Sequence, residues 1–346
     1  MSLDVGVRAA DLIRDLFNRS FDDTAGSVVS AITRSSNSGI IKKRLSELTA
    51  EAQLLAEAGK RIEADNAILR ALLADMDDVI ATNVDKIRLA GGGLQNDAFS
   101  VADLANRQLM FEGIDDATRT LLSAQWNNVD PQVMKTLVDY VDSAAWEQQL
   151  SQYGDDVVQK IRGITINGQI AGWSPNRVAD AIVNSVQGKA GGAGFPSSQA
   201  ENLMRTLQMQ SFRTAQTINR VANADILESQ IRISALDNAC LACVALHGES
   251  FPIDQRIDDH HRGRCTSIPV IKNRPRTIES GQEWWDNRTP EQKLAQAGPA
   301  NYAALEAGAV SLPDYVQPYK DDVFGDMLRE SSLSGILGDS AKEYYT

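Results

Sequence analysis

The stretch ACLACVALHGESFPIDQRIDDHHRGRC, residues 239–265, contains all three cysteines and all three histidines of a chain of 346 residues. Cys240 and Cys243 have the CxxC spacing of a metal-binding knuckle, and Cys265 follows the adjacent pair His260-His261. Three thiolates and one imidazole make a complete tetrahedral ligand set for zinc in structural sites. The stretch therefore predicts a structural zinc ion held by Cys240, Cys243, Cys265 and either His260 or His261.

Either histidine can close the loop, because four residues separate His260 from Cys265 and three separate His261 from it. The histidine that does not bind the metal would be exposed or hydrogen-bonded to Asp258 or Asp259. Burial of the thiols as small apolar residues is the alternative interpretation, but it does not explain why cysteines and histidines share one short stretch. Four donors are available without His247, so the site can close without an open position for a catalytic water.

A second spacing in the same stretch bears on enzymatic activity. His247-Gly248-Glu249 has the HxE spacing of nucleobase deaminases, where it precedes a PCxxC motif on a separate helix. Here HxE follows Cys243 by four residues, and no proline precedes Cys240, which argues against a deaminase. The sequence also lacks HExxH, GxSxG and GxGxxG motifs. We therefore predict no catalytic residues, no organic cofactor and no enzymatic activity.

Short segments of strand character surround the cysteine stretch. Residues 231–236 alternate between apolar and polar side chains, and 250–253 and 266–271 have the composition of two more short strands. We expect a small β-rich module at 230–275. Such a module buries little apolar surface, so a bound metal would contribute directly to its folding.

The rest of the chain has helical patterning, which predicts a mainly α fold with a small β-rich zinc-knot module (α+β). The expected domains are an N-terminal helical or coiled-coil arm (1–95), a helical scaffold (96–229), the zinc module (230–275) and a C-terminal helical tail (276–346). Asp130-Pro131 and Ser174-Pro175 mark helix starts, and a break is expected near Gly154. A long helix is expected over 198–229. The glycine-rich loop 188–195 lacks the Walker spacing, so it is interpreted as a hinge.

The N-terminal arm carries a heptad pattern. One apolar seam repeats every seven residues through Ile41, Leu48, Leu55, Ile62, Leu69 and Met76. The companion seam is interrupted by Gly59 and Asn66 before it reaches Ile80. This favours a long helix packed on its own chain over a self-associating coiled coil. We expect the helix to end at Gly91-Gly92-Gly93.

Composition restricts the partners. The formal net charge of −12 repels a nucleic-acid backbone, whose binding depends on lysine and arginine. The most basic stretch, 256–276, also contains acidic residues that offset its positive charge. We therefore expect at most a weak nucleic-acid contact there. The sequence has no run of about 20 apolar residues, so we expect no membrane partner. Three cysteines grouped with histidines suit a reducing compartment.

The cysteine stretch also carries a family resemblance. The residues that carry it are Asp237, Cys240, Cys243, Leu246, Gly248, His260, Arg264-Cys265 and Ile268-Pro269-Val270. They resemble the Cys/His motif of the phage Mu F-like head-morphogenesis proteins, roughly DxxCxxCxxLxG followed by HPxCRC and a short strand. Residues 204–223 resemble the family's Arg-Thr-led helix, with Arg205-Thr206 or Arg213-Thr214 as the lead. The tail around Trp284-Trp285 and 296–314 resembles the family's closing segment, so the resemblance covers about 130–315.

Three departures from the family pattern stand out. Gly263 replaces the first cysteine of CRC, and His261 replaces the proline after the motif histidine. Leu207 or Ala215 occupies the acidic position that commonly follows Arg-Thr. The first two departures change the ligand geometry but still leave four donors, whereas the third puts the family's use of that helix in doubt.

The resemblance implies a minor capsid protein of a tailed phage, an assembly component without enzymatic activity. Its expected partners are the portal protein and the major capsid or scaffold protein, with at most a weak contact to packaged DNA. Its expected location is the virion, in the head interior or at the portal vertex, after assembly in the host cytoplasm. Two alternatives come from other functional classes: a DNA-contacting protein acting in packaging or ejection, and a zinc-dependent hydrolase or transferase-type enzyme.

Overall fold

The computed structural model describes residues 61–111, 114–170, 175–187, 195–261, 263–321 and 325–345, with Trp173 and a few positions between 24 and 47. The first heptad positions, Ile41, Leu48 and Leu55, and the expected hinge at 188–194 lie outside the described residues. The described part is mainly α-helical with one three-stranded and one two-stranded antiparallel sheet, which confirms the predicted fold class. It divides into two compact units, and none of its helices is long and apolar enough to cross a membrane.

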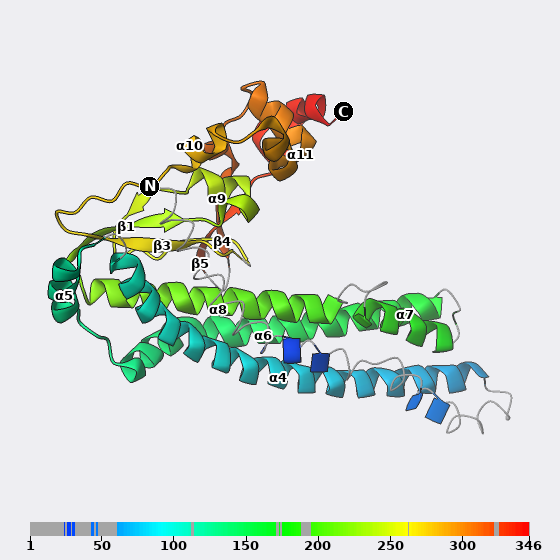
Figure 1. Ribbon diagram of the computed structural model, residues 1–346. Coiled ribbons are helices and arrows are strands. Elements are labelled where there is room, and N and C mark those ends of the chain that lie inside the picture. The colour runs from blue at the N-terminus through cyan, green and yellow to red at the C-terminus, as the bar shows by residue number, and fades with distance from the viewer. Residues whose placement is uncertain are drawn as a thin grey trace. The chain divides into compact units, whose positions relative to one another are not determined.

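One unit, the helical bundle, comprises Ser20–Leu94 and Ala144–Leu207. Long helices form it, namely parts of α4 (Arg61–Phe111), α6 (Pro131–Ile170) and α8 (Phe195–Val221), together with α7 (Pro175–Gln187). They run along one another and share one apolar core (Figure 1). This core includes Met76, Ile80, Ile87, Leu94, Leu150, Val157, Ile161, Ile182, Met204 and Leu207. Met76 and Ile80, one from each heptad seam, are therefore buried against the chain itself.

Two predicted helix interruptions in these helices are wrong. α4 continues through Gly91-Gly92-Gly93 to Phe111, and α6 has no break at Gly154. A glycine weakens a helix by about 1 kcal/mol relative to alanine, whereas burial of a leucine or isoleucine contributes about 1.5–3 kcal/mol. Ile87 and Leu94, on either side of the glycines, are fully buried, so packing holds the helix together. Both predicted proline starts are confirmed, and the Asp130 carboxylate accepts from the Gln132 N–H at 2.7 Å.

The other unit, the sheet unit, comprises Gln95–Ser143 and Gln208–Thr346 among the described residues. Its three-stranded sheet has the order β2-β1-β3, with β1 at Leu227–Ile233, β2 at Ser250–Phe251 and β3 at Thr266–Ile271. The register pairs Gln230 with Phe251 and Ile231 with Ile268. Phe212 and Ala215 of α8 pack with apolar side chains of β1 and β3 in one core.

β3 lies where the sequence predicts it, and β2 falls within its predicted range, but β1 begins four residues early because α8 ends at Val221 rather than near 229. The Asn223 amide explains the early end. Its oxygen accepts from the Asn127 N–H at 2.7 Å, and its nitrogen donates to the carbonyls of Asn127 and Asn219. These bonds stabilise a turn in place of further helix.

The C-terminal part of the sheet unit is less helical than expected. Its helices are α9 (Leu241–Ala245), α10 (Gly281–Asp286), α11 (Pro290–Glu306) and α12 (Leu333–Leu337), and α5 (Asp116–Gln125) belongs to the same unit. Short 3-10 turns lie at Leu236–Asn238, Leu312–Tyr315 and Gly338–Tyr344. The tail also contains an antiparallel hairpin, β4 (Val316–Asp321) with β5 (Gly325–Glu330), which corrects the prediction of an all-helical tail. In β5 only Met327 is buried, so the strand lacks the apolar alternation that would reveal it in the sequence.

Candidate metal centre

The three cysteines and one histidine come from two elements that the sheet brings together. Cys240 is the N-cap of α9, and Cys243 lies in its first turn, so both thiols occupy the same end of this short helix. His260 and Cys265 lie in the segment that leads into β3, here called the ligand loop (residues 259–261 and 263–265). β1 pairs with β3 and leads into α9, which sets the ligand loop beside the helix.

The sulfur and nitrogen atoms of these residues converge. The Nε2 atom of His260 is 3.6 Å from the Sγ atoms of both Cys240 and Cys243. The Sγ atoms of Cys243 and Cys265 are 3.2 Å apart. Two groups, Cys240–Cys243–His260 and Cys243–Asp259–Cys265, each have all ligand atoms within 4.8 Å of one another, and they share Cys243. Zinc–sulfur bonds of about 2.3 Å in a tetrahedron place neighbouring sulfurs about 3.8 Å apart, so this group of residues could hold a metal ion.

The geometry separates the two adjacent histidines. The Nδ1 atom of His260 is 2.8 Å from the His261 carbonyl oxygen, which directs Nε2 toward the thiols. A hydrogen bond from the second ring nitrogen to a carbonyl is the usual way in which proteins orient a metal-binding histidine. His261 instead places its Nε2 atom 3.2 Å from the Asp321 carboxylate on β4. Of the two predicted candidates, His260 therefore lies with the thiols and His261 does not, and the expected partner of the spare histidine, Asp258 or Asp259, is replaced by Asp321.

A buried ionic network lies against the thiols. Asp259 is fully buried, and its Oδ2 atom accepts from Arg213 at 2.6 Å and from the Cys265 N–H at 3.1 Å. Its Oδ1 atom accepts from the His260 N–H at 2.9 Å and from Arg232 at 3.4 Å. We call Arg213, Asp259 and Arg232 the Arg–Asp–Arg network. Its carboxylate holds the backbone on both sides of the ligand loop, so it fixes the positions of two metal-binding candidates.

The network also links the ligand loop to α8 and β1. Arg213 on α8 donates to the carbonyls of Gly263 at 2.8 Å and Cys265 at 2.9 Å. Arg232 on β1 donates to the Asp258 carbonyl at 2.6 Å. Sequence reasoning considered Asp259 only as a partner of a histidine and missed the two arginines. In the sequence Arg213 stands out only as part of the Arg213-Thr214 pair, and Arg232 has no distinguishing pattern. Their partner Asp259 is 46 and 27 residues away in the chain.

Gly263 fits this arrangement. A Cβ atom at this position would lie 2.1 Å from Oδ2 of Asp259, so the carboxylate fills the space that any side chain would need. A glycine at position 263 is therefore what leaves room for the buried aspartate. The ligand set that remains is three thiols and one imidazole.

Protonation in the site follows from its neighbours. Burial alone would raise the pKa of Asp259, but Arg213 and Arg232 hold it below its ordinary value, so the carboxylate is charged. The hydrogen bond with Cys243 raises the pKa of the Cys265 thiol, and burial raises it further. The hydrogen bond with Cys240 similarly raises the pKa of Cys243. A metal ion must therefore displace thiol protons in order to bind.

His247, the third histidine, has a different role. It is buried, and its Nδ1 atom accepts from the Ser234 N–H at 2.9 Å. Burial lowers the pKa of His247 to about 4, so its ring is neutral at pH 7. It belongs to neither group of metal-binding candidates, in line with the expectation that four donors are available without it. His247 joins the turn after α9 to the end of β1.

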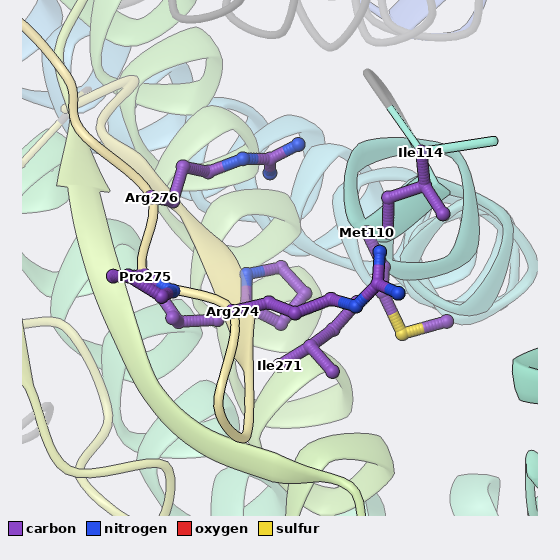
Figure 2. A pocket seen from close by; sticks show the side chains of 8 residues that line it. Met110, Ile114, Ile271, Arg274, Pro275 and Arg276 are labelled. Carbon is purple, nitrogen blue, oxygen red and sulfur yellow. The ribbon is translucent and has the colours of Figure 1, made fainter. Parts of the chain in front are cut away.

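A separate pocket of about 220 Å³ lies in the sheet unit (Figure 2). It is lined by Met110, Ile114, Pro269, Val270, Ile271, Arg274, Pro275 and Arg276. Figure 2 shows Arg274 reaching toward Met110 and Ile114. Arg274 donates to the Thr118 hydroxyl at 3.1 Å and Arg276 to the Leu109 carbonyl at 2.7 Å. The eight lining residues provide neither a nucleophile nor an acid–base pair.

Cys240, Cys243, His260 and Cys265 lie together at the metal centre. No model of a protein family, no curated protein and no solved structure matches the chain.

Proposed function

We propose that Cys240, Cys243, His260 and Cys265 bind a structural zinc ion. The convergence of three sulfur atoms and one imidazole nitrogen carries the proposal. Zinc prefers this donor set, and four protein ligands leave no position for a reactive water. The ion would supply a bridge between α9 and the ligand loop. The residues themselves do the positioning: the His261 carbonyl orients the imidazole, and Asp259 holds the loop amides.

We further propose that the chain is an assembly protein of a tailed-phage head. The Cys/His motif resembles that of the Mu F-like head-morphogenesis proteins, and the motif residues lie at one site. Of the two candidate Arg-Thr pairs on α8, the pair Arg213-Thr214 supplies the arginine that contacts the ligand loop, whereas Arg205 pairs with Glu201. A dedicated structural role for the motif suits a protein that works by binding the portal and the capsid or scaffold proteins.

The metal part is tested on the purified full chain. We expect about one zinc ion per chain by elemental analysis after extensive dialysis. Cys243→Ser should abolish tight zinc binding and lower the stability of the sheet unit. A matched control is Ser250→Ala, which changes a small exposed side chain on β2. Wild-type protein that retains no zinc under conditions that keep its thiols reduced would overturn the metal assignment.

The assembly part is tested genetically and by binding. We expect the gene to lie beside those for portal and capsid proteins, and the purified chain to co-assemble with the portal protein encoded there. Its deletion should yield heads that lack infectivity. Two other results would instead favour the alternatives: steeply salt-dependent DNA binding would indicate packaging or ejection, and zinc-dependent turnover of a substrate would indicate an enzyme.

A further inference from the structure

The Arg–Asp–Arg network has more positive than negative charge. Arg213 and Arg232 are 3% and 1% exposed, and Asp259 is the one carboxylate that both contact. The next charged groups, Arg256, Asp258 and Asp326, are partly or fully exposed, so solvent screens them more than it screens the buried network. One guanidinium charge therefore remains without a carboxylate. An unpaired buried charge is destabilising, so a further negative charge beside Arg232 would stabilise the site.

Asp259 itself cannot supply that charge as a metal ligand. Its two oxygens already accept from Arg213, Arg232 and the backbone N–H groups of His260 and Cys265. These four donors use the lone pairs that a carboxylate offers. Although one of its oxygens is 3.5 Å from the Cys243 sulfur, Asp259 positions the ligand residues and does not itself bind the metal. The thiols are the other groups beside Arg232 that can carry a negative charge when a metal is bound.

Arg232 is placed to interact with those thiols. Its Nη2 atom is 3.9 Å from the Cys243 Sγ atom, at the limit of an N–H···S hydrogen bond. A divalent ion on three thiolates and one neutral imidazole has one net negative charge. That charge equals the single positive charge that the network leaves over.

We propose that Arg232 is the counter-cation of the metal centre, so that the network selects a divalent ion held by three thiolates and one imidazole. This inference rests on the metal site proposed above. A divalent ion with four thiolates has two net negative charges, one more than the network can balance. A divalent ion with two thiolates and two imidazoles has no net charge, so it would leave Arg232 unpaired. Arg232 is thus a positioning and charge-balancing residue rather than a ligand.

The number of thiolates is measured on the wild-type chain. Cobalt(II) serves as the probe, because thiolate-to-cobalt absorption in the near ultraviolet increases with each bound sulfur. We expect a tetrahedral spectrum with the intensity of three thiolates. A spectrum of two thiolates would overturn the charge match while leaving a metal site in place, whereas no cobalt binding at all would overturn the metal site itself. This measurement needs no variant, so it remains decisive if a substitution prevents folding.

The role of Arg232 is measured by zinc competition against a chromophoric chelator. Arg232→Gln should weaken zinc binding by about 10- to 100-fold, the range found for residues that support metal ligands. Arg264→Gln is the matched control, because it makes the same change in net charge at an exposed position beside Cys265. It should alter affinity by no more than about twofold. Equal effects of the two substitutions would overturn the proposal.

A double-mutant cycle separates charge from hydrogen-bond geometry. Cys240→His exchanges one thiolate for a neutral ligand and leaves a centre without net charge. In the wild-type background this substitution should weaken zinc binding strongly. In the Arg232→Gln background the loss of zinc affinity should be smaller by a factor of at least about ten, because the unmatched charge is already gone. Additive effects would show that Arg232 acts only through local structure, which would overturn the charge match.

Discussion

The two halves of α8 show how differently the helical bundle and the sheet unit are held together. The half in the bundle buries apolar side chains, namely Leu203, Met204 and Leu207. The half in the sheet unit buries mainly polar ones, including Gln208, Gln210, Ser211, Arg213, Gln216, Asn219 and Arg220. Apolar packing tolerates exchanges of similar volume, whereas a buried polar network is stable only when its members are paired. One continuous helix therefore contributes tolerant packing to one unit. To the other it contributes specific pairing through Arg213, Gln216 and Arg220.

The largest expected effect comes from breaking the specific pairing. Asp259→Asn keeps the shape of the side chain but removes the charge between Arg213 and Arg232. Removing one partner of a buried ionic group costs about 3–5 kcal/mol, so we expect the sheet unit to unfold at much lower denaturant. Hydrogen exchange should show early loss of protection in β1, β3 and α9, with protection retained in the part of α6 that belongs to the bundle, residues 144–170.

Asp254→Asn is the control for this change, because Asp254 lies in the same loop region and is exposed. It should leave the exchange pattern unchanged. Simultaneous loss of protection in α6 and the strands after Asp259→Asn would contradict the view that the two units depend on different interactions.

A smaller effect is expected from protonation of His247. Its pKa is about 4 in the folded protein because of burial, against an ordinary value of 6.5. Between these values the unfolded chain binds the proton and the folded chain does not, so stability falls as pH decreases. Lowering the pH from 7 to 5 should remove about 2 kcal/mol through this residue.

A variant isolates the contribution of His247 from other acid effects. His247→Asn keeps an acceptor atom near the position of Nδ1 for the Ser234 N–H and removes the titrating ring. Urea unfolding at both pH values should show a smaller loss in the variant than in the wild type. An equal loss in both proteins would mean that His247 is not the source of the acid sensitivity.

The contrast between the units also explains what the sequence could predict. Local signals predicted the proline-led helix starts of α6 and α7 and strand β3, and they singled out five metal-binding candidates, because each depends on residues close together in the chain. The choice of His260 over His261, the role of Asp259 and the end of α8 at Val221 depend on partners far away, such as Asp321, Arg213 and Asn127. Such pairings have no periodicity, so only the folded structure identifies them.

The smallest expected effect tests the tolerant side of the comparison. Gly93 lies exposed within α4, and a Cβ atom added there meets no atom within 4 Å. Gly93→Ala should therefore stabilise the bundle by about 0.8–1 kcal/mol, since alanine has the higher helix propensity. Gly168→Ala in α6 makes the same chemical change where the new Cβ would lie 2.6 Å from Val178 Cγ2, so it should destabilise instead. Thermal unfolding of both variants measures the two signs, and a stabilising Gly168→Ala would mean that α6 and α7 pack less tightly than the structure has them.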